Sequence, residues 1–400
     1  MNENKALSSF QILLMAVAAG VAVANIYYNQ PILKEIASTF HATEGQVGLI
    51  SMLSQIGYGL GLFFITPLGD KVNKKNLILI LLVILFATLF LMAVAGSIYQ
   101  LWVLSVLIGL LSVSVQVIVP MAATLDPVNR GKTVGTIFTG ILIGILAARV
   151  FSGFIAEWMG WRYVYGFSAV MVFAVTVLLK IYLPEVGNVF IGSYRQLLGS
   201  ALQQIKRFPL LRETALIGAL QFGLFCSFWT TLTFHLSGAP FYFHSDRIGL
   251  FGLVAIAGAA MAPVFGKMAD RGNANRTLVL TTLIIIFSVV LLKLMPGSVI
   301  ALILAVLLLD MGAQGMQVTN VALIYTLDAT SHSRINTIYM TSFFIGGAIG
   351  TSVGLFCWQH GGWNLVTWQL LLWACLVLVL VLRKKKPEQA PVTNENDELV

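Results

Sequence analysis

The sequence "PLGDKVNKK" (residues 67–75) follows an apolar run, and a related sequence, "GKMADRGNANR" (residues 266–276), follows another apolar run in the second half of the chain. Their aspartates, Asp70 and Asp270, lie 200 residues apart. A second pair, "TLDPVNRGKT" (124–133) and "TLDATSHSRINT" (326–337), repeats at nearly the same offset. Because a constant offset over several landmarks indicates duplication, we predict two homologous halves.

The composition indicates the class of protein. Soluble domains carry about 25% charged residues, whereas this chain has 10% charged and 58% hydrophobic residues and a mean hydropathy of +0.89. Apolar runs of about 20 residues, each long enough to cross ~30 Å of hydrocarbon as a helix, recur along it. We predict an all-α membrane protein with twelve transmembrane helices in two six-helix bundles, with spans near residues 10–33, 45–66, 76–95, 99–122, 133–157, 163–183, 213–236, 247–269, 276–295, 298–322, 335–358 and 364–382.

The predicted bundles occupy residues 1–183 and 213–382. The linker between them, residues 184–212, has apolar side chains at helical spacing with basic residues beside them, which predicts an amphipathic helix. This stripe suits a helix on the cytoplasmic leaflet and equally a helix packed beneath the bundle, so both interpretations stay open. The tail, residues 383–400, is basic and then polar, a composition typical of disordered segments.

The distribution of the positive charge, net +8, indicates the orientation of the chain in the membrane and does not indicate nucleic-acid binding. Of the 24 Lys and Arg residues, 19 lie on the side of both predicted termini, 4 lie on the other side, and Arg149 lies within a span. The positive-inside rule then places both termini and the linker in the cytoplasm. The first nine residues lack a signal-peptide pattern. We therefore expect a multi-pass protein of the bacterial inner membrane.

A twelve-span chain with an acidic loop motif after spans 2 and 8 resembles the major facilitator superfamily, whose loop signature runs roughly G-x-L-a-D-r-x-G-r-k. The first copy has Thr66 and Asn73 where glycines are usual. Within the superfamily, the chain is most similar to bacterial arabinose-efflux-type permeases and drug–proton antiporters. Their fifth-span motif, g-x-x-x-G-P-x-x-G-G, is matched at Gly140 and Gly144, but Arg149 replaces its last glycine. We expect Arg149 to supply the positive charge that a fourth-span arginine supplies in that branch.

The resemblance implies a latch between the two halves on the cytoplasmic side, which breaks when the cytoplasmic gate opens. A carboxylate at a helix end can pair with basic side chains or with a neighbouring helix N-terminus. A solvated turn with topogenic charge is the alternative. The latch residues implied by the resemblance are Asp70, Lys71, Lys74, Lys75, Arg130, Asp270, Arg271 and Arg334.

Two charged residues interrupt predicted spans far from either surface. Arg149 stands in "ILAARVFSGF" (145–154) and Asp310 in "LLLDMGAQGMQ" (307–317). At ~1.5 Å per residue they lie ~12 and ~18 Å from the outer ends of their spans. A lone charge at the bilayer centre costs ~2.5–3.5 kcal/mol and usually faces a cavity or a partner. We predict that Asp310 carries the proton and Arg149 is its intermittent counter-charge; a snorkelling Arg149 and a buried, protonated Asp310 are the alternatives.

Polar residues in four spans predict a lined cavity. Asn25, Tyr28 and Asn29 share one helix face, and Pro31 with the outward-lying Gln30 indicates a kink or the end of that helix. The resemblance implies that spans 1, 4, 7 and 10 surround the cavity; hydrogen bonding between helices is the alternative for each amide. The predicted substrate-binding residues are Asn25, Tyr28, Asn29, Gln116, Gln221, Trp229, Gln314, Gln317 and Asn320.

Together these features predict a monomeric, proton-coupled secondary transporter that exports a small organic molecule by antiport and alternating access. An uptake symporter or uncoupled facilitator of the same fold stays open, as does a membrane sensor or scaffold that does not transport. The sequence has no metal-ligand spacing, nucleophile motif or phosphate-binding glycine loop, so we expect no enzyme. We expect no metal and no cofactor, the proton gradient as energy source, and the bilayer and a small solute, but no nucleic acid, as partners.

Overall fold

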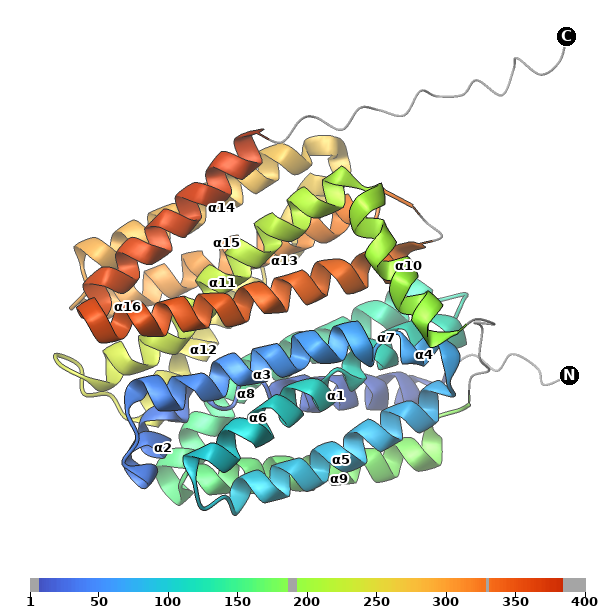
Figure 1. Ribbon diagram of the computed structural model, residues 1–400, viewed down its shortest axis with the longest axis horizontal. Coiled ribbons are helices and arrows are strands. Elements are labelled where there is room, and N and C mark those ends of the chain that lie inside the picture. Colours follow the sequence, from blue (N-terminus) through green and yellow to red (C-terminus); the bar gives the residue numbers. More distant parts are fainter. Residues whose placement is uncertain (1–6, 186–192, 329–330, 384–400) are drawn as a thin grey trace, which may run out of the picture.

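The computed structural model describes residues 7–185, 193–328 and 331–383, without the side chain of Asp270. Throughout these residues the secondary structure is helical, with no strand. Figure 1 shows the helices of the first half (blue to green) lying beside those of the second half (yellow to red). The predicted tail after Arg383 and the start of the predicted linker lie outside the described residues.

The first half begins with a broken helix and ends with two long ones. The regular helix ends at Ala24, the chain turns, and Pro31 lies in a short 3-10 helix that begins at Gln30, so the predicted kink or helix end in this region is confirmed. Proline cannot donate a backbone hydrogen bond, so a regular helix does not resume directly at Pro31. The helices are α1 (Ser9–Ala24), η1 (Gln30–Ile32), α2 (Leu33–Phe40), α3 (Glu44–Phe64), α4 (Leu68–Lys71), α5 (Lys74–Ala93), α6 (Ile98–Ser112), α7 (Ser114–Leu125), α8 (Arg130–Met159) and α9 (Trp161–Tyr182).

The second half follows a connecting helix and repeats this order. Its last helix has a break at Gly362, whose φ of +56° is easily adopted only by residues without a side chain. The helices are α10 (Tyr194–Arg207), α11 (Pro209–Ser237), α12 (Ser245–Ala259), α13 (Ala262–Met268), η2 (Ala269–Asn273), α14 (Ala274–Leu294), α15 (Val299–Ile324) and α16 (His332–Arg383).

Ten helical segments in the described residues are long and apolar enough to cross a membrane. The number differs from the twelve predicted spans for two local reasons. Helix α1, with 16 residues, is shorter than a full crossing because the chain turns after Ala24. Helix α16, with 52 residues, comprises two helices that meet at the non-helical Gly362, and these are the last two predicted spans. Each predicted span therefore coincides with apolar helix.

Two helix crossings show that the halves share one packing pattern. A Cβ atom added to Gly144 of α8 would overlap the carbonyl oxygen of Gly20 in α1, and one added to Gly350 of α16 would overlap that of Gly223 in α11. Glycine at these points lets two backbones touch. The same crossing thus occurs once in each half, about 200 residues apart.

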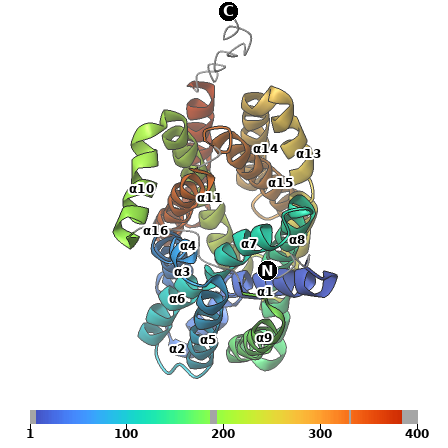
Figure 2. The ribbon, with the colours of Figure 1, turned by 90° about the vertical axis from the view of Figure 1, so that its right-hand side faces the viewer.

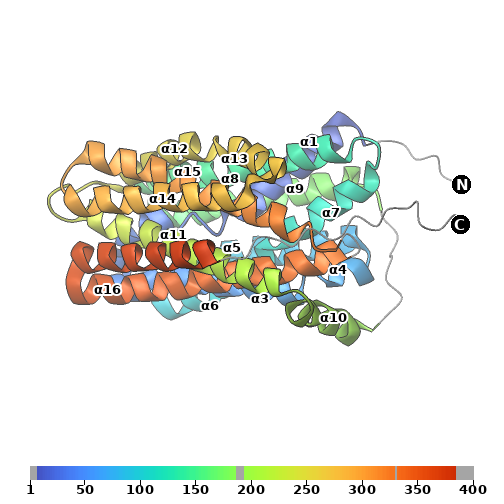
Figure 3. The ribbon, with the colours of Figure 1, turned by 90° about the horizontal axis from the view of Figure 1, so that it is seen from above.

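The two ends of the helix bundle differ in how closely the halves approach. We call the end that carries α2 the α2 end, and the end that carries α10 and α4 the α10 end (Figures 1 and 3). At the α2 end, hydrogen bonds join the halves: Ser245 Oγ donates to Pro31 O at 3.0 Å, and Thr233 Oγ1 donates to Gln30 O at 2.8 Å. Figure 2 shows the second half above the first from the α10 end. There α10 connects the halves.

Helix α10 is amphipathic, as predicted, and it contacts both halves. Its buried face, with Leu197 and Ala201, packs against α16 and α11. The Tyr194 hydroxyl donates to Phe64 O at the end of α3, and Arg207 forms a 2.9 Å ion pair with Asp328 in the second half. Leu202, by contrast, stays exposed. This helix therefore holds the α10 ends of α3 and α16 at a defined separation.

Candidate functional site

Arg149 lies deep inside the protein, in the middle of α8. Its side chain is 1% exposed, and its Nε donates a 2.7 Å hydrogen bond to Gln30 Oε1, next to Pro31. The guanidinium carbon lies 4.0 Å from the centroid of the Trp229 ring and 5.3 Å from that of Tyr27. An aromatic face attracts a cation that has lost its water, so Trp229 of α11 compensates part of the cost of burial.

The place of Arg149 in the duplicated fold makes its charge conspicuous. Gly249 and Gly252 of α12 allow α8 to approach, because a Cβ on Gly252 would come 3.0 Å from the Arg149 Cβ. In the related crossing, Gly48 of α3 faces Leu355 of α16. Leu355 is as far beyond Gly350 as Arg149 is beyond Gly144. Arg149 therefore occupies a position that the other half fills with an apolar residue.

Asp310 lies on α15, on the other side of Trp229. It is 1% exposed, and a Cβ on Gly258 of α12 would come 3.1 Å from the Asp310 Cβ. The crossing of α12 with α15 repeats that of α3 with α6, where Gly57 faces the backbone of Leu110 as Gly258 faces that of Met311. The equivalent of Asp310 is therefore Gly109. Again one half holds a charge where the other holds a nonpolar residue.

The two charges influence each other without forming an ion pair. Each acts electrostatically on the other, but no nitrogen–oxygen distance between Arg149 and Asp310 is 4.0 Å or less. The Trp229 indole lies next to the Asp310 carboxyl group, although its Nε1 has no hydrogen-bond partner. Trp229 thus lies beside both charges, and we call Arg149, Trp229 and Asp310 together the row. The predicted roles of Asp310 as proton carrier and of Arg149 as its intermittent counter-charge stay predictions.

Several polar atoms around this row are buried without a hydrogen-bond partner. They include both Nη atoms of Arg149 and Oδ2 of Asp310. Leaving one such group unpaired costs about 1–3 kcal/mol, and more for a charged group. A buried polar atom that the protein leaves unpaired needs an explanation, and a functional role is one of those available. On the second half the same condition holds for Gln221 Oε1, Trp229 Nε1, Thr230 Oγ1, both amide atoms of Asn320 and the Tyr339 hydroxyl.

The predicted lining residues of the first half use their polar atoms within that half. Asn25 Oδ1 accepts from Ser168 at 2.7 Å, and Asn29 Oδ1 accepts from Ser51 at 2.6 Å. Gln116 Nε2 donates to the Tyr58 hydroxyl at 3.1 Å. These are the bonds between helices that were the alternative for each amide. Tyr28 is buried 5.9 Å from the ring of Phe151 in α8.

The predicted lining residues of the second half are arranged differently. Trp229 contacts Arg149, whereas Gln221 and Asn320 are buried with unpartnered amide atoms. Gln314 and Gln317 are half-buried on α15. Trp229, Gln221 and Asn320 are therefore all buried in the second half, to which Asp310 also belongs.

Sequence reasoning missed Gln30, Tyr27 and Tyr339 as members of the site. Gln30 was expected to lie outward, but the turn after Ala24 directs its amide to Arg149. The adjacent Pro31 was the available signal, because it marks an irregular backbone at membrane depth, which is tolerated only inside the protein. Tyr339 lies close to Thr337, Thr341 and Ser342 in the sequence, and this cluster of hydroxyl groups was the available signal.

The predicted latch residues lie at the α10 end. The charges of Lys74 and Arg334 act on the Asp70 carboxylate, so α4 of the first half and α16 of the second half face each other there. No ion pair within 4.0 Å joins Asp70 to either residue. Lys71, Arg130 and Arg271 are exposed and Lys75 is half-buried, while the side chain of Asp270 lies outside the description. The latch itself stays a prediction.

The described residues contain no group of three or more His, Cys, Asp or Glu side chains placed to hold a metal ion. What the row of Arg149, Trp229 and Asp310 offers is a guanidinium with two free Nη atoms, an aromatic face and a carboxyl group. A guanidinium binds carboxylate or phosphate oxygens through such a pair of nitrogens.

Known proteins resemble this chain over most of its length. It is 39% identical over 361 residues to "Uncharacterized transporter YgaY" of Escherichia coli O157:H7, covering 90% of this chain and 92% of that protein. It is 21% identical over 377 residues to "Uncharacterized MFS-type transporter YybF" of Bacillus subtilis, covering 92% of each.

A solved structure shares the fold, and a family model covers most of the chain. The crystal structure of a bacterial homolog to the human lysosomal transporter Spinster superposes with a TM-score of 0.70 at 14% identity, over 93% of this chain and 95% of that one. Residues 15–351 match the family model of the Major Facilitator Superfamily. The protein is a multi-pass membrane transporter, not an enzyme, and it belongs to the Major Facilitator Superfamily.

Proposed function

We propose that this transporter is a proton-coupled antiporter of the bacterial inner membrane that exports a small organic molecule by alternating access. Asp310 carries the proton, and Arg149 is its intermittent counter-charge. The observation that supports this most is the row of Arg149, Trp229 and Asp310, in which two buried opposite charges come from opposite halves and do not pair.

The placement of these charges suits coupling because the halves move relative to each other. Breaking a buried pair, or burying one partner alone, costs several kcal/mol, about 3–5 in soluble proteins. A change in the separation of α8 and α15 therefore changes how strongly Asp310 holds its proton. By linkage, protonation of Asp310 changes the preferred separation by the same free energy. The proton and the conformation thus control each other.

The free guanidinium nitrogens explain how a solute would enter this exchange. A solute with a carboxylate, phosphate or polar carbonyl oxygen can accept hydrogen bonds from Arg149 while Trp229 contacts its apolar part. A solute that also carries an ammonium or hydroxyl donor can bind the Asp310 carboxylate, but only after Asp310 has released its proton. Solute binding and protonation of Asp310 then compete, which is the requirement for antiport.

Alternating access needs a second conformation in which the α10 end closes and the α2 end opens. The structure described here is joined at the α2 end by hydrogen bonds between the halves. Asp70 and Arg334 face each other at the α10 end without pairing, so they are placed to pair when that end closes. With the α10 end in the cytoplasm, as the distribution of basic residues predicts, this conformation opens toward the cytoplasm.

The test is transport in proteoliposomes that carry a pH-sensitive dye, with a broad panel of metabolites and drugs. For a compound that moves protons with the native protein, Asp310→Asn is expected to abolish proton-driven accumulation but to retain exchange of labelled for unlabelled solute. Glu213→Gln, which neutralises an exposed carboxylate on α11, serves as the matched control and is expected to keep both activities. Proton flux that survives Asp310→Asn would mean that Asp310 is structural.

A further inference from the structure

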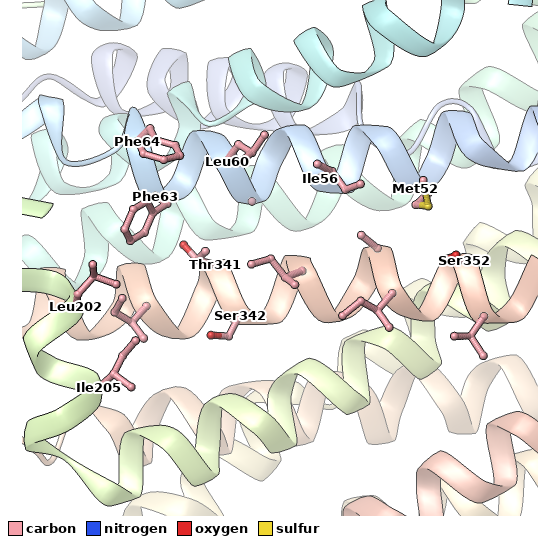
Figure 4. A pocket seen from close by; sticks show the side chains of 16 residues that line it. Met52, Ile56, Leu60, Phe63, Phe64, Leu202, Ile205, Thr341, Ser342 and Ser352 are labelled. Atoms are coloured by element: carbon pink, nitrogen blue, oxygen red, sulfur yellow. The ribbon is translucent and has the colours of Figure 1, made fainter. Parts of the chain in front are cut away.

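A groove lies between α3 and α16 toward the α10 end of the protein. Its volume is about 730 Å³. Figure 4 shows apolar side chains of α3, among them Ile56, Leu60 and Phe63, facing α16 across it. Leu202 and Ile205 of α10 close one end. The groove runs along the contact of α3 with α16, from the place where Gly48 meets Leu355 past the place where Gly59 faces Ile345.

The groove opens sideways, toward the hydrocarbon of the membrane. Leu60 of α3 is 41% exposed, and Ile345 and Ile349 of α16 are 49% and 53% exposed, all within membrane-spanning helices. On the inner side, the rings of Tyr58 and Phe344 lie 4.2 Å apart and close the groove toward the row of Arg149, Trp229 and Asp310. An occupant therefore comes from the lipid and does not reach the transport site from here.

Polar groups gather where the groove meets α10. Thr341 Oγ1 is buried without a hydrogen-bond partner, and Ser342 lies beside it (Figure 4). Just beyond, α10 carries Arg195 and Lys206, whose side chains are exposed and form no ion pair within the described residues. An apolar slot that ends in hydroxyl groups and then in cations matches an amphipathic anion: a long apolar chain, an ester and a phosphate, in that order.

We propose that this groove binds one acyl chain of an anionic phospholipid from the leaflet on the α10 side. The glycerol ester lies at Thr341, and the phosphate lies beyond it, in the positive field of Arg195 and Lys206 on α10. Because α3 and α16 belong to opposite halves, a chain that contacts both stabilises the arrangement of the halves that is closed at the α2 end. The lipid thereby regulates the transporter, independently of what it transports.

The experiment uses the full chain in nanodiscs of phosphatidylcholine that contain a minor amount of a phospholipid with a photoreactive acyl chain. The probe is either phosphatidylglycerol or phosphatidylcholine with the same chain, and mass spectrometry locates the adducts. Phosphatidylglycerol adducts are expected to concentrate on residues 52–64 and 338–353. Arg195→Gln and Lys206→Gln are each expected to lower them about fivefold, the effect of one cation near an anionic lipid surface.

A groove-filling variant and its control complete the test. Ile345→Trp is expected to remove the groove adducts of both probes, whereas Val83→Trp, at an equally lipid-facing position on α5, is expected to leave them unchanged. Equal labelling of the groove and of the exposed face of α5 would show that lipid contacts the groove no more than the rest of the membrane-facing surface, and this result would overturn the proposal. Equal labelling by both probes would overturn it too, and this comparison needs only the native protein.

Discussion

Arg149 shows how much a single residue can reveal and where sequence reasoning stops. Its charge inside an apolar run was visible in the sequence, and counting residues along two spans predicted that it would lie level with Asp310. What it contacts was not predictable, because Gln30 reaches it from an irregular turn and Trp229 from a helix 80 residues away in the chain. Periodicity does not describe turns, and one sequence does not fix the rotation of a helix.

Replacing Arg149 tests whether it serves transport or stability. Arg149→Met is expected to abolish transport and to destabilise the protein by ~3–5 kcal/mol, because it leaves Asp310 buried without a counter-charge. Arg149→Met combined with Asp310→Leu removes both charges and is expected to recover this stability without recovering transport. Arg149→Lys keeps the charge but loses the planar contact with Trp229 and the bond to Gln30, so partial activity is expected. Thermal denaturation in detergent and solute exchange in liposomes measure both. A double variant as unstable as Arg149→Met would identify the arginine as structural.

Asp126 gives a pH-dependent prediction outside the membrane spans. Its carboxylate accepts hydrogen bonds from Thr133 Oγ1 at 2.7 Å and from Asn129 N at 3.2 Å, and these bonds lower its pKa below the ordinary value. A lowered pKa stabilises the folded state above the ordinary carboxyl pKa, and this contribution is lost as the pH falls through the lowered one. Asp126→Asn should therefore reduce the melting temperature at neutral pH and have no effect in strong acid.

Thr133→Val provides the comparison for Asp126→Asn. It removes the hydrogen bond that contributes most to the lowered pKa while keeping the carboxylate. The difference in stability between neutral and acidic pH should shrink but not vanish in melting curves recorded across that range. An unchanged pH dependence in both variants would show that this loop does not contribute to stability.

Among the helices, the apolar runs were predictable and their interruptions were less so. Apolar length predicted helix throughout, and Pro31 marked the end of the first one. The "GGW" sequence marked the boundary between the last two spans, and the two helices of α16 meet there, at Gly362. Glycine permits a turn without requiring one, so packing decides at which glycines a helix ends.

The crossing of α1 with α8 supplies a prediction for helix packing. Gly144→Ala places a methyl group against the Gly20 carbonyl and is expected to destabilise the protein by ~1–3 kcal/mol. Gly135→Ala, in the same helix but with open space around it, is the matched control and should stabilise the protein by ~0.5–1 kcal/mol. Unfolding of both variants in detergent and denaturant measures the difference. Equal stabilities would mean that the helices separate freely at this crossing.

For the molecule as a whole, the hydrogen bonds between the halves hold the α2 end closed. Lys34 of α2 donates to the carbonyl of Ser237 at the end of α11. Because α2 belongs to the first half and α11 to the second, this bond must break when the α2 end opens. Lys34→Met removes a hydrogen bond from a charged donor, worth ~1.5–3 kcal/mol. The population with an open α2 end should rise about tenfold or more, which distance measurements between spin labels on α2 and α12 would detect.

Lys293→Met is the control for Lys34→Met. Lys293 donates a 2.7 Å hydrogen bond to Asn364, but both residues belong to the second half, so its loss should leave the distance between the halves unchanged. Equal shifts in the two variants would show that the bond of Lys34 does not hold the halves together. The contrast depends only on which half the partner belongs to.

The repeats in the sequence predict the duplication, but only the packing shows which residues of the two halves correspond and where they differ. Arg149 corresponds to Leu355, and Asp310 corresponds to Gly109. Two identical copies side by side would hold either two arginines and two aspartates or none, never one of each. Fusion into a single gene therefore freed each copy to change alone. Since then neither copy can be exchanged for the other, and a protein built from two first halves or two second halves would lack one member of the pair.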